Sequence, residues 1–380
     1  MPPRHGSRPA RLLLAGVTDP GYNCGVEREL ELVIDDIAFG GKGVGRADGK
    51  AVFVPFTIES ERVSARIVRE KKSFAEADLL TVLQASPQRA EPRCPYFGRC
   101  GGCSYQHMLY EHQLHWKTRQ VKQALQRIGK FREPPLRPIV PSPLDYEYRN
   151  RITVHVENGV VGFFRHDAHR LIDVECCPIA QPEVNEELAT LRARRPRDGH
   201  YTLRAQDGPR VFSQTNDAVA IHLADAIAAL VPPNQTLLID AYCGAGFFAK
   251  RLLQKCQRIV GLDWDIHAIA AAQAGATAEE TYLAGEIAIH LGEQLVQADP
   301  KTTTVILDPP ATGLGPDVRE ILRRHPAATL LYVSCDPPTL ARDLADLAPA
   351  LTLESVTPFD MFPQTAEIEV LAHLTTTGAI

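Results

Sequence analysis

The stretch QTLLIDAYCGAGFFAKRLLQKC (235–256) starts with an apolar run of β-forming residues, passes through a glycine-containing turn and ends in a pattern suited to a helix. The same strand-then-helix order recurs in RIVGLDWDIHAIAAAQAGA (258–276), TTVILDPPATGL (303–314) and TLLYVSCDPPTLARDLADL (329–347). Strands that alternate with helices predict a parallel sheet covered by helices on both faces. We therefore expect an α/β fold from about residue 212 onward.

The residues at the carboxyl ends of these strands are the first candidates for a ligand site, because ligands of such sheets bind there. Gly244 and Gly246 follow the first strand and allow a tight turn close to a ligand. Asp263 ends the second strand about 20 residues later, where a carboxylate accepts hydrogen bonds from a ribose diol. Nicotinamide cofactors and S-adenosylmethionine both contain this ribose, so these residues leave the cofactor open.

Two further strand ends favour a methyltransferase. Asp308 is followed by two prolines that fix the next turn, and Asp-Pro-Pro at this location is typical of methyltransferases that act on planar atoms of bases. A plain Asp-Pro turn is the alternative. Cys335 ends the next strand and would point into the same crevice as Asp308. A buried structural cysteine is the alternative here, but Asp336 and the following Pro-Pro turn favour an exposed, held thiol.

The N-terminal half of the chain has a different pattern. Residues 28–85 alternate apolar and polar residues in short runs between glycine-rich turns, which predicts a small barrel of about five strands. Such barrels often bind oligonucleotides. Residues 110–129 predict one helix, and residues 148–174 predict a hairpin with Asn158 and Gly159 at its turn.

The charge is distributed unevenly between the two halves. Residues 1–210 contain 32 Lys and Arg against 26 Asp and Glu, a net charge of +6, whereas residues 211–380 contain 9 against 20, a net charge of -11. The first half is therefore the better candidate for contact with phosphate, although solvated helix faces explain the difference equally well. Candidate phosphate contacts are Lys42, Arg46, Lys71, Lys72, Lys117 and Arg119. No apolar run approaches the ~18 residues that span a membrane.

The cysteines suggest a second site. Cys94, Cys100 and Cys103 have a C-x5-C-x2-C spacing, and Cys177 is the candidate for the fourth thiolate that a tetrahedral or cubane site needs. Cys176 is a rival ligand because it is adjacent. The spacing alone leaves zinc and an iron-sulfur cluster equally open. The remaining cysteines that we interpret as bystanders are Cys24, Cys243 and Cys256.

From about residue 28 to 375 the chain resembles the RNA uridine carbon-5 methyltransferase family, whose members have a TRAM domain and an iron-sulfur cluster. The motifs that carry the resemblance are GGKGVGRADGKAVFVPF, CPYFGRCGGCSYQH, Cys177-Pro178, FSQTN, DAYCGAGFF, LDPPATGL, VSCDPPTLARDL and DMFPQTAEIEV. The resemblance implies a tail at 1–27, a TRAM β-barrel at 28–86 and a central iron-sulfur and RNA-binding domain at 87–211. It implies a Rossmann-like class I methyltransferase domain at 212–380, with a doubly wound, mostly parallel seven-stranded sheet.

The resemblance also implies roles for individual residues. Cys335 would be the nucleophile that adds to carbon 6 of uracil, and Glu369 the base that removes the carbon-5 proton. The residues expected at S-adenosylmethionine are Gln214, Tyr242, Gly244, Asp263 and Asp308. Asp240 is expected to serve the glycine loop more than the ligand. The expected ligands of a 4Fe-4S cluster are Cys94, Cys100, Cys103 and Cys177. The expected substrate is a flipped-out uridine of RNA, and 23S ribosomal RNA is favoured over transfer RNA. The protein is expected to be a cytoplasmic monomer without a membrane partner.

Three positions depart from the family pattern. Ala311 replaces the arginine that usually follows Asp-Pro-Pro, and Ser60 stands where a Gly-Glu pair is usual. Glu367 replaces a histidine two residues before Glu369, and strand alternation would place both carboxylates on one side. They would then raise each other's pKa, unless Glu367 is solvated.

Two other classes of protein are alternatives to this interpretation. A non-catalytic RNA-binding paralogue would explain Ala311 and Glu367 but not the presence of both Cys335 and Glu369. A nicotinamide oxidoreductase with an iron-sulfur relay would explain the cysteines and glycines but leaves Asp-Pro-Pro without a role.

Overall fold

A computed structural model of the chain describes residues 28–205 and 214–377. The expected tail at 1–27, and Cys24 within it, lie outside the described residues. The chain divides into two compact units, one up to Pro92 together with Ser104–Leu109, and the other formed by Arg93–Cys103 and the chain from Tyr110 onward. Across the described part of the chain, no helix combines the length and apolar character that crossing a membrane requires.

The first unit is a closed barrel, as the alternating pattern predicts. Its five strands are β1 Glu29–Ile37, β2 Gly43–Ala47, β3 Lys50–Val54, β4 Arg62–Glu70 and β5 Phe74–Gln84, joined in the order β1-β2-β3-β5-β4. Every second residue points inward and packs into one apolar core that includes Ile34, Val54 and Val63. Ser60 has a φ of +69°, which explains why glycine is usual at this turn.

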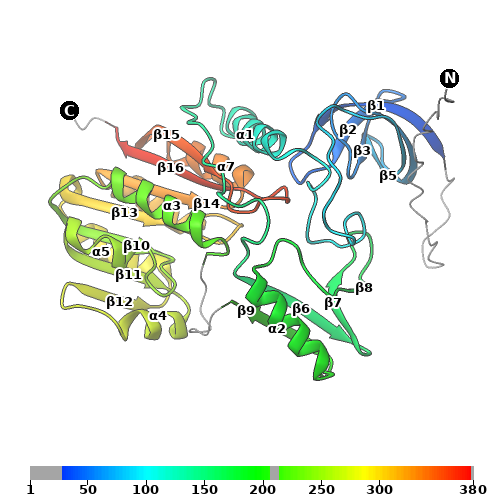
Figure 1. The fold of residues 1–380 in the computed structure, drawn as a ribbon. Helices are drawn as coiled ribbons and strands as arrows, with labels where there is room; N and C mark the ends of the chain where they lie inside the picture. The colour runs from blue at the N-terminus through cyan, green and yellow to red at the C-terminus, as the bar shows by residue number, and fades with distance from the viewer. Residues whose placement is uncertain (1–27, 206–213, 378–380) are drawn as a thin grey trace, which may run out of the picture. The chain divides into compact units, whose positions relative to one another are not determined.

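The second unit contains α1 Tyr110–Arg127 and a four-stranded antiparallel sheet (Figure 1). The strands of this sheet are β8 Leu171–Asp173, β7 Val160–Phe164, β6 Arg151–Glu157 and β9 Gly199–Arg204, in that order, and the helix α2 Pro182–Ala193 packs on one of its faces. Asn158 and Gly159 have φ angles of +51° and +81°, so the predicted hairpin turn between β6 and β7 is confirmed.

A seven-stranded sheet fills the rest of the second unit, in the order β12-β11-β10-β13-β14-β16-β15. Its strands are β10 Gln235–Ala241, β11 Cys256–Asp263, β12 Glu280–Ala284, β13 Thr303–Leu307, β14 Thr329–Ser334, β15 Leu351–Phe359 and β16 Glu369–Thr376. Pairs among β10, β11, β12, β13 and β14 are parallel, while β16 is antiparallel to both β14 and β15. The mostly parallel sheet expected from the sequence is therefore confirmed.

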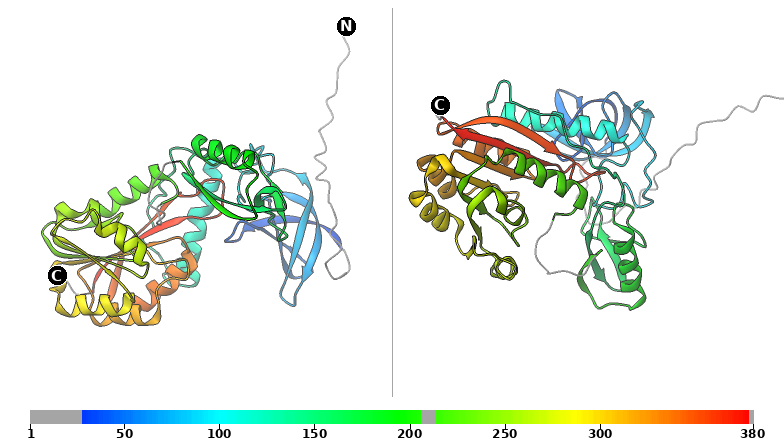
Figure 2. Two further views of the ribbon diagram at one scale, coloured as in Figure 1. Left: turned by 90° about the horizontal axis from the view of Figure 1, so that it is seen from below. Right: turned by 60° about the vertical axis from the view of Figure 1, so that its left-hand side comes forward.

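Helices cover both faces of this sheet, because alternate residues of each strand point to opposite sides. Leu237 and Ile239 of β10 belong to a core with the helices α5 Ile287–Gln297, α6 Pro316–Arg324 and α7 Pro337–Leu347, and with α1. Leu238 points the other way, to a core with α3 Asp217–Leu230 and α4 Ile266–Gln273. The left view of Figure 2 shows the sheet between these two layers.

Two local predictions were wrong. The segment after the glycine turn forms two short 3-10 helices, η1 Ala249–Arg251 and η2 Leu253–Lys255, in place of the expected α-helix. The turn places Tyr242, Gly244 and Gly246 in the left-handed region, which leaves few residues before β11 starts at Cys256. Pro337 and Pro338 form the first turn of α7 and are not a separate turn, because proline has no N–H to lose at a helix start.

Candidate functional site

The sheet brings the predicted strand-end residues to one edge. Tyr242, Asp263, Asp308 and Cys335 each come directly after a strand or at its last residue. The parallel register pairs Ala241 with both Leu262 and Leu307, so the three central strands end at the same level. A pocket opens at this edge, lined by Gln214, Tyr242, Cys243, Gly244, Ala245, Phe247, Phe248 and Asp308.

Four of the five residues predicted to contact the methyl donor line this pocket: Gln214, Tyr242, Gly244 and Asp308. Gln214 Nε2 donates to Asp308 Oδ2 at 3.4 Å across it. Asp263 lies behind the pocket and organises the loop, since its Oδ2 accepts from Gly244 N at 2.8 Å and its Oδ1 from Asp265 N at 2.9 Å. Cys243, expected to be a bystander, is one of the lining residues.

The turn that shapes the pocket needs unusual backbone angles. Tyr242, Gly244 and Gly246 have φ angles of +65°, +53° and +79°. A Cβ on Gly246 would lie 2.7 Å from the hydroxyl oxygen of Tyr282, so only glycine fits there. Asp240, buried at the end of β10, accepts from Ala249 N at 3.1 Å and so holds the segment after the turn. This contact agrees with the expectation that Asp240 serves the loop.

Cys335 and Glu369 face each other across two antiparallel strands. The register pairs Ser334 of β14 with Val370 of β16, so the next pair in the same register is Cys335 and Glu369. Glu369 is 4% exposed, whereas Cys335 is half-buried. Because directly opposite residues of an antiparallel pair lie about 5 Å apart, these two side chains are close enough to act on one small ring.

The site concentrates acidic groups. Burial, and then the charges of Glu369 and Asp308, raise the pKa of the Cys335 thiol to about 12. Burial raises the pKa of Asp308 to about 7. Burial, and then the charges of Asp308 and Glu367, raise the pKa of Glu369 well above its ordinary value. Groups that oppose each other's ionisation in this way form a site that favours a cationic ligand.

Glu367 does not share a strand with Glu369, so the expectation that the two carboxylates face the same side of a strand was wrong. β16 begins at Glu369, and Glu367 is exposed in the preceding loop. Gln364 has a φ of +69°, and Thr365 Oγ1 accepts from Glu367 N at 3.1 Å, so a turn separates Glu367 from the strand. The Glu367 charge still contributes to the raised pKa of Glu369.

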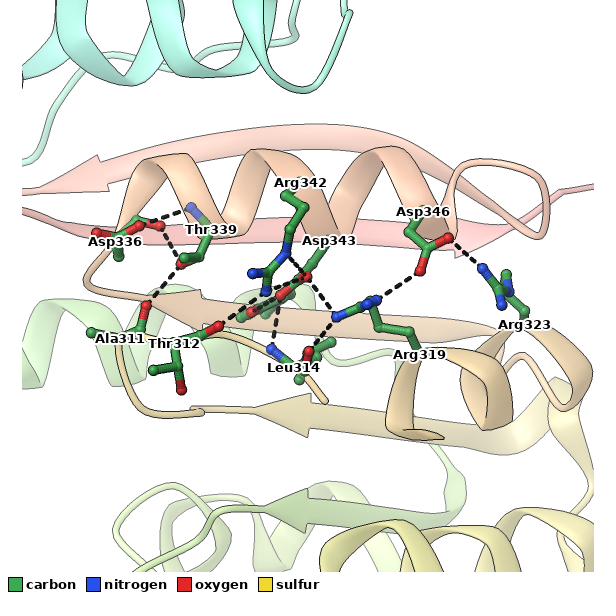
Figure 3. A network of polar contacts seen from close by, with 11 residues as sticks. Ala311, Thr312, Leu314, Arg319, Arg323, Asp336, Thr339, Arg342, Asp343 and Asp346 are labelled. Carbon is green, nitrogen blue, oxygen red and sulfur yellow. Dashed lines mark hydrogen bonds and ion pairs between the residues drawn. The ribbon is translucent and has the colours of Figure 1, made fainter. Parts of the chain in front are cut away.

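A polar network holds the loop after Asp-Pro-Pro (Figure 3). The buried Asp343 of α7 accepts from Leu314 N at 2.8 Å, from the Tyr332 hydroxyl at 2.9 Å and from Arg319 at 3.2 Å. Sequence reasoning did not single out Asp343. The signal for it is an acidic residue on the apolar face of α7, between Leu340 and Leu344.

The same network shows what surrounds Ala311. Its carbonyl oxygen accepts from Thr339 Oγ1 at 3.0 Å, and the next carbonyl, of Thr312, accepts from Arg342 at 3.0 Å (Figure 3). The loop therefore has a guanidinium bound to it from α7, although the family's arginine is absent at 311.

The segment that leads to Glu369 is held by α1. Lys117 is fully buried, and its Nζ lies 2.5 Å from Asp360 Oδ1 and 2.9 Å from the carbonyl oxygen of Phe362. Gln364 and Gln113 exchange two hydrogen bonds of 3.0 Å. The interpretation of Lys117 as a phosphate contact was therefore wrong, because burial and an ion pair remove it from solvent.

The four predicted cluster cysteines lie in one region of the second unit. Cys103 and Cys177 both pack against the buried group Tyr146, Tyr148 and Ile179. Burial, and then the charges of Cys94 and Cys100, raise the pKa of Cys177 to about 12. Within the described ranges, however, no three His, Cys, Asp or Glu side chains are arranged to hold a metal ion.

Cys176 and Cys256 are placed differently from the four cluster candidates. Cys176 is exposed. The half-buried Cys256 donates its thiol proton to the carbonyl oxygen of Leu252 at 3.1 Å.

Comparisons with known proteins agree with this arrangement. Residues 195–377 match the family "tRNA (Uracil-5-)-methyltransferase", and residues 26–80 match the TRAM domain. An "Uncharacterized RNA methyltransferase" of Aquifex aeolicus is 29% identical over 92% of this chain and 99% of its own length. Another of the same description from Bdellovibrio bacteriovorus is 29% identical over 91% of this chain and 95% of its own.

A solved structure shares the fold. The tRNA (uracil-54, C5)-methyltransferase of Pyrococcus abyssi, solved in complex with S-adenosyl-L-homocysteine, has a TM-score of 0.70 and 23% identity, and the match covers 91% of this chain and 99% of that one. These matches show that the chain is a methyltransferase, in which residues 195–377 are similar to the tRNA (uracil-5-)-methyltransferase family and residues 26–80 to the TRAM domain.

Proposed function

We propose that the protein transfers a methyl group from S-adenosylmethionine to carbon 5 of a uridine in RNA. The observation that carries the proposal is the antiparallel register that places Cys335 opposite Glu369 beside the Asp308 pocket. A nucleophile and a base on opposite sides of one ring position are what this reaction needs.

The pocket has the chemistry that a sulfonium donor requires. S-adenosylmethionine carries positive charge at its sulfonium and ammonium groups and, when bound, supplies an electrophilic methyl group. The residues that would hold it are Gln214, Tyr242, Gly244, Asp263 and Asp308. Among the described residues that line the pocket, Asp308 is the only carboxylate, and a nearby cation would lower its raised pKa and that of Cys335. The acidic character of the site therefore supports a cationic donor over a nicotinamide dinucleotide, whose pyrophosphate is anionic.

Cys335 and Glu369 would divide the chemistry between them. Carbon 5 of uracil is a poor nucleophile, so the Cys335 thiol would first lose its proton to solvent and the thiolate would form a bond to carbon 6, which leaves an enolate whose carbon 5 is reactive. Carbon 5 would then take the methyl group as the methyl–sulfur bond of the donor breaks and S-adenosyl-L-homocysteine leaves, after which Glu369 removes the carbon-5 proton. The electron pair of that C–H bond forms the 5,6 double bond, the bond from carbon 6 to sulfur breaks, and the thiolate is released. The high pKa of Glu369 makes its carboxylate a strong base for this step.

A covalent adduct tests the assignment. RNA that contains 5-fluorouridine has no removable proton at carbon 5, so the wild type should form an adduct with it that survives denaturing electrophoresis. Cys335→Ser should form none. With ordinary RNA, Glu369→Gln should accumulate an adduct that the wild type resolves. Methylation of RNA by Cys335→Ser would disprove the role of the thiol.

We also propose a 4Fe-4S cluster bound by Cys94, Cys100, Cys103 and Cys177. Cys103 and Cys177 come from two segments that pack against the same buried group, and burial, followed by the charges of Cys94 and Cys100, raises the pKa of Cys177. Anaerobic reconstitution should give about four iron and four sulfide per chain. Cys177→Ser should lose the cluster while the exposed neighbour Cys176→Ser keeps it. Loss of the cluster from Cys176→Ser alone would exchange the two assignments.

For the RNA, we propose a uridine of 23S ribosomal RNA, since a TRAM barrel combined with the cysteine pattern is typical of the ribosomal branch that the chain resembles. The Pyrococcus abyssi protein of similar fold is a tRNA methyltransferase by name. Mapping 5-methyluridine in ribosomal and transfer RNA from cells with and without the gene decides between them. A site lost only from transfer RNA would overturn the ribosomal assignment.

A further inference from the structure

We propose that the segment 147–150 couples the chain around Cys177 to the proton abstraction at Glu369, an inference that rests on the proposed function. The segment lies directly before β6 and is bonded to three other parts of the second unit: the residues after Cys177, the residues before Glu369, and the donor pocket. Tyr148 and Asn150 make the second and third of these connections, so both are positioning residues.

The connection to Cys177 runs through the backbone. Glu147 N donates to the carbonyl oxygen of Pro178 at 3.1 Å, and Arg149 N donates to that of Ile179 at 2.9 Å. Pro178 and Ile179 are the two residues that follow Cys177. A shift of Cys177 would therefore shift the segment that is bonded to them.

The Tyr148 ring belongs to the buried group that two of the cysteines contact. It is 2% exposed, and Cys103 and Cys177 both pack against the group that it forms with Tyr146 and Ile179. Ligation of both cysteines to the proposed cluster would fix the two chain segments that pack against this group. Loss of a ligand would leave the Tyr148 ring less firmly held, because close-packed neighbours transmit a shift to one another.

The Tyr148 hydroxyl reaches the segment that leads to Glu369. It donates to the carbonyl oxygen of Pro363 at 3.0 Å in a buried position. Between Pro363 and Glu369 the chain has little freedom, because Gln364 exchanges two hydrogen bonds with α1 and Ile368 is 1% exposed. A displaced Tyr148 would therefore displace the base, and a small error in the position of a reacting group slows a reaction strongly.

Asn150 reaches the donor pocket. Its Nδ2 donates to the carbonyl oxygen of Gln214 at 2.9 Å, and its backbone N donates to that of Thr215 at 3.0 Å. Gln214 lines the pocket and donates to Asp308. One short segment therefore holds a residue of the donor pocket and the chain before the base, and through it the cysteines take part in a reaction that transfers no electrons.

Single-turnover methylation of ordinary RNA tests the Tyr148 link. Tyr148→Phe keeps the ring and removes the hydroxyl, so it should slow the decay of the covalent adduct about tenfold, the effect of one lost buried hydrogen bond. Its adduct formation with 5-fluorouridine RNA and its iron content after anaerobic reconstitution should match those of the wild type. Tyr201→Phe is the matched control, because it removes a hydroxyl that donates to the Arg197 carbonyl at 2.9 Å, and it should leave adduct decay unchanged.

Isothermal titration with S-adenosyl-L-homocysteine tests the Asn150 link. Asn150→Ala should weaken binding about tenfold and leave adduct decay at saturating donor unchanged. Gln126→Ala removes an amide that donates to the Arg132 carbonyl at 3.1 Å on the exposed face of α1, and it should bind as the wild type does.

A double variant tests the coupling itself. Cys177→Ser should slow adduct decay, and its addition to Tyr148→Phe should cause no further slowing, because both changes act through one link. Slowing factors that multiply would overturn the coupling. If Cys177→Ser cannot be purified, the wild type and Tyr148→Phe are compared before and after reconstitution, which should speed adduct decay in the wild type alone; an equal gain in both would also overturn it.

The 5-fluorouridine adduct separates this proposal from the proposed function. If the wild type forms that adduct while Tyr148→Phe resolves the ordinary adduct, and Asn150→Ala binds the donor product, as the wild type does, the coupling is wrong and the proposed function stands. If the wild type forms no adduct with 5-fluorouridine RNA, both fail.

Discussion

The buried ion pair between Lys117 and Asp360 gives the sharpest test of how the Glu369 segment is held. Both side chains are fully buried, and the Nζ to Oδ1 distance is 2.5 Å. At an effective dielectric constant of about 20, two unit charges at this distance attract by about 7 kcal/mol. Withdrawal of each ion from water costs several kcal/mol, so the intact pair contributes little net stability. Removal of one partner leaves the other charge buried and unpaired.

Lys117→Met should therefore lower the free energy of unfolding by about 3–5 kcal/mol, measured by urea denaturation. Lys122→Met, which removes an exposed lysine from the same helix, should change it by less than about 0.5 kcal/mol. The double variant Lys117→Met/Asp360→Leu should recover most of the loss, because no isolated charge remains. If Lys117→Met unfolds within about 0.5 kcal/mol of the wild type, the argument from an unpaired buried carboxylate is refuted.

The same variant should also affect catalysis. Lys117 binds the carbonyl oxygen of Phe362, and Tyr148 donates to that of Pro363 at 3.0 Å, so α1 and Tyr148 fix the segment before Glu369. Loss of one of these contacts should reduce the rate of methyl transfer more than the affinity for the donor, because none of these contacting residues lines the pocket proposed for the donor. Isothermal titration with S-adenosyl-L-homocysteine and single-turnover methylation separate the two effects.

Three further predictions concern residues that hold the loops after the strand ends. Burial raises the pKa of Asp240 to about 7, above its value of about 4 in the unfolded chain. The free energy of unfolding should therefore fall as pH rises from about 4 to about 7. Urea denaturation across that range should show a smaller fall for Asp240→Asn. Asp343→Asn should lower the free energy of unfolding by about 2–4 kcal/mol, because it weakens buried charge-assisted hydrogen bonds. Asp346→Asn, which removes a partly exposed carboxylate, should lower it by less than about 1 kcal/mol. Gly246→Ala should abolish binding of S-adenosyl-L-homocysteine through the clash with Tyr282, and Gly275→Ala, whose nearest neighbour would be 3.6 Å away, should not. Wild-type behaviour of Asp343→Asn, or tight binding by Gly246→Ala, would contradict the assigned contacts.

The residues at the strand ends could be located from the sequence because their signals are local. A run of β-forming residues before glycine or Asp-Pro-Pro indicates where a strand stops, and parallel strands that stop together place those residues at one edge. For this reason one pocket is lined by Tyr242, Gly244 and Asp308 together. The segment after the glycine turn was predicted less well, because it forms two short 3-10 helices where the sequence pattern indicated one α-helix.

The residues that hold the site could not be located in this way. Lys117 and Asp360 are 243 positions apart, and neither differs in its local pattern from a surface residue. Lys117 belongs to a run of basic residues that suggests phosphate, and only the packing of α1 on the sheet reverses that interpretation. Glu367 was misplaced for a different reason. The prediction extended the period-2 alternation of β16 to residues before its start at Glu369, although a turn at Gln364 precedes the strand.

The electrostatics of the site imply an order of events under the proposed function. Burial, and then the carboxyl groups of Glu369 and Asp308, raise the pKa of the Cys335 thiol to about 12, which favours the protonated thiol at neutral pH. A cation bound beside Asp308 would oppose that effect, so the donor that supplies the methyl group also prepares the nucleophile. The sulfur should therefore attack carbon 6 only in the complex that contains both donor and uridine, and the acidic pocket is what couples the first event to the second.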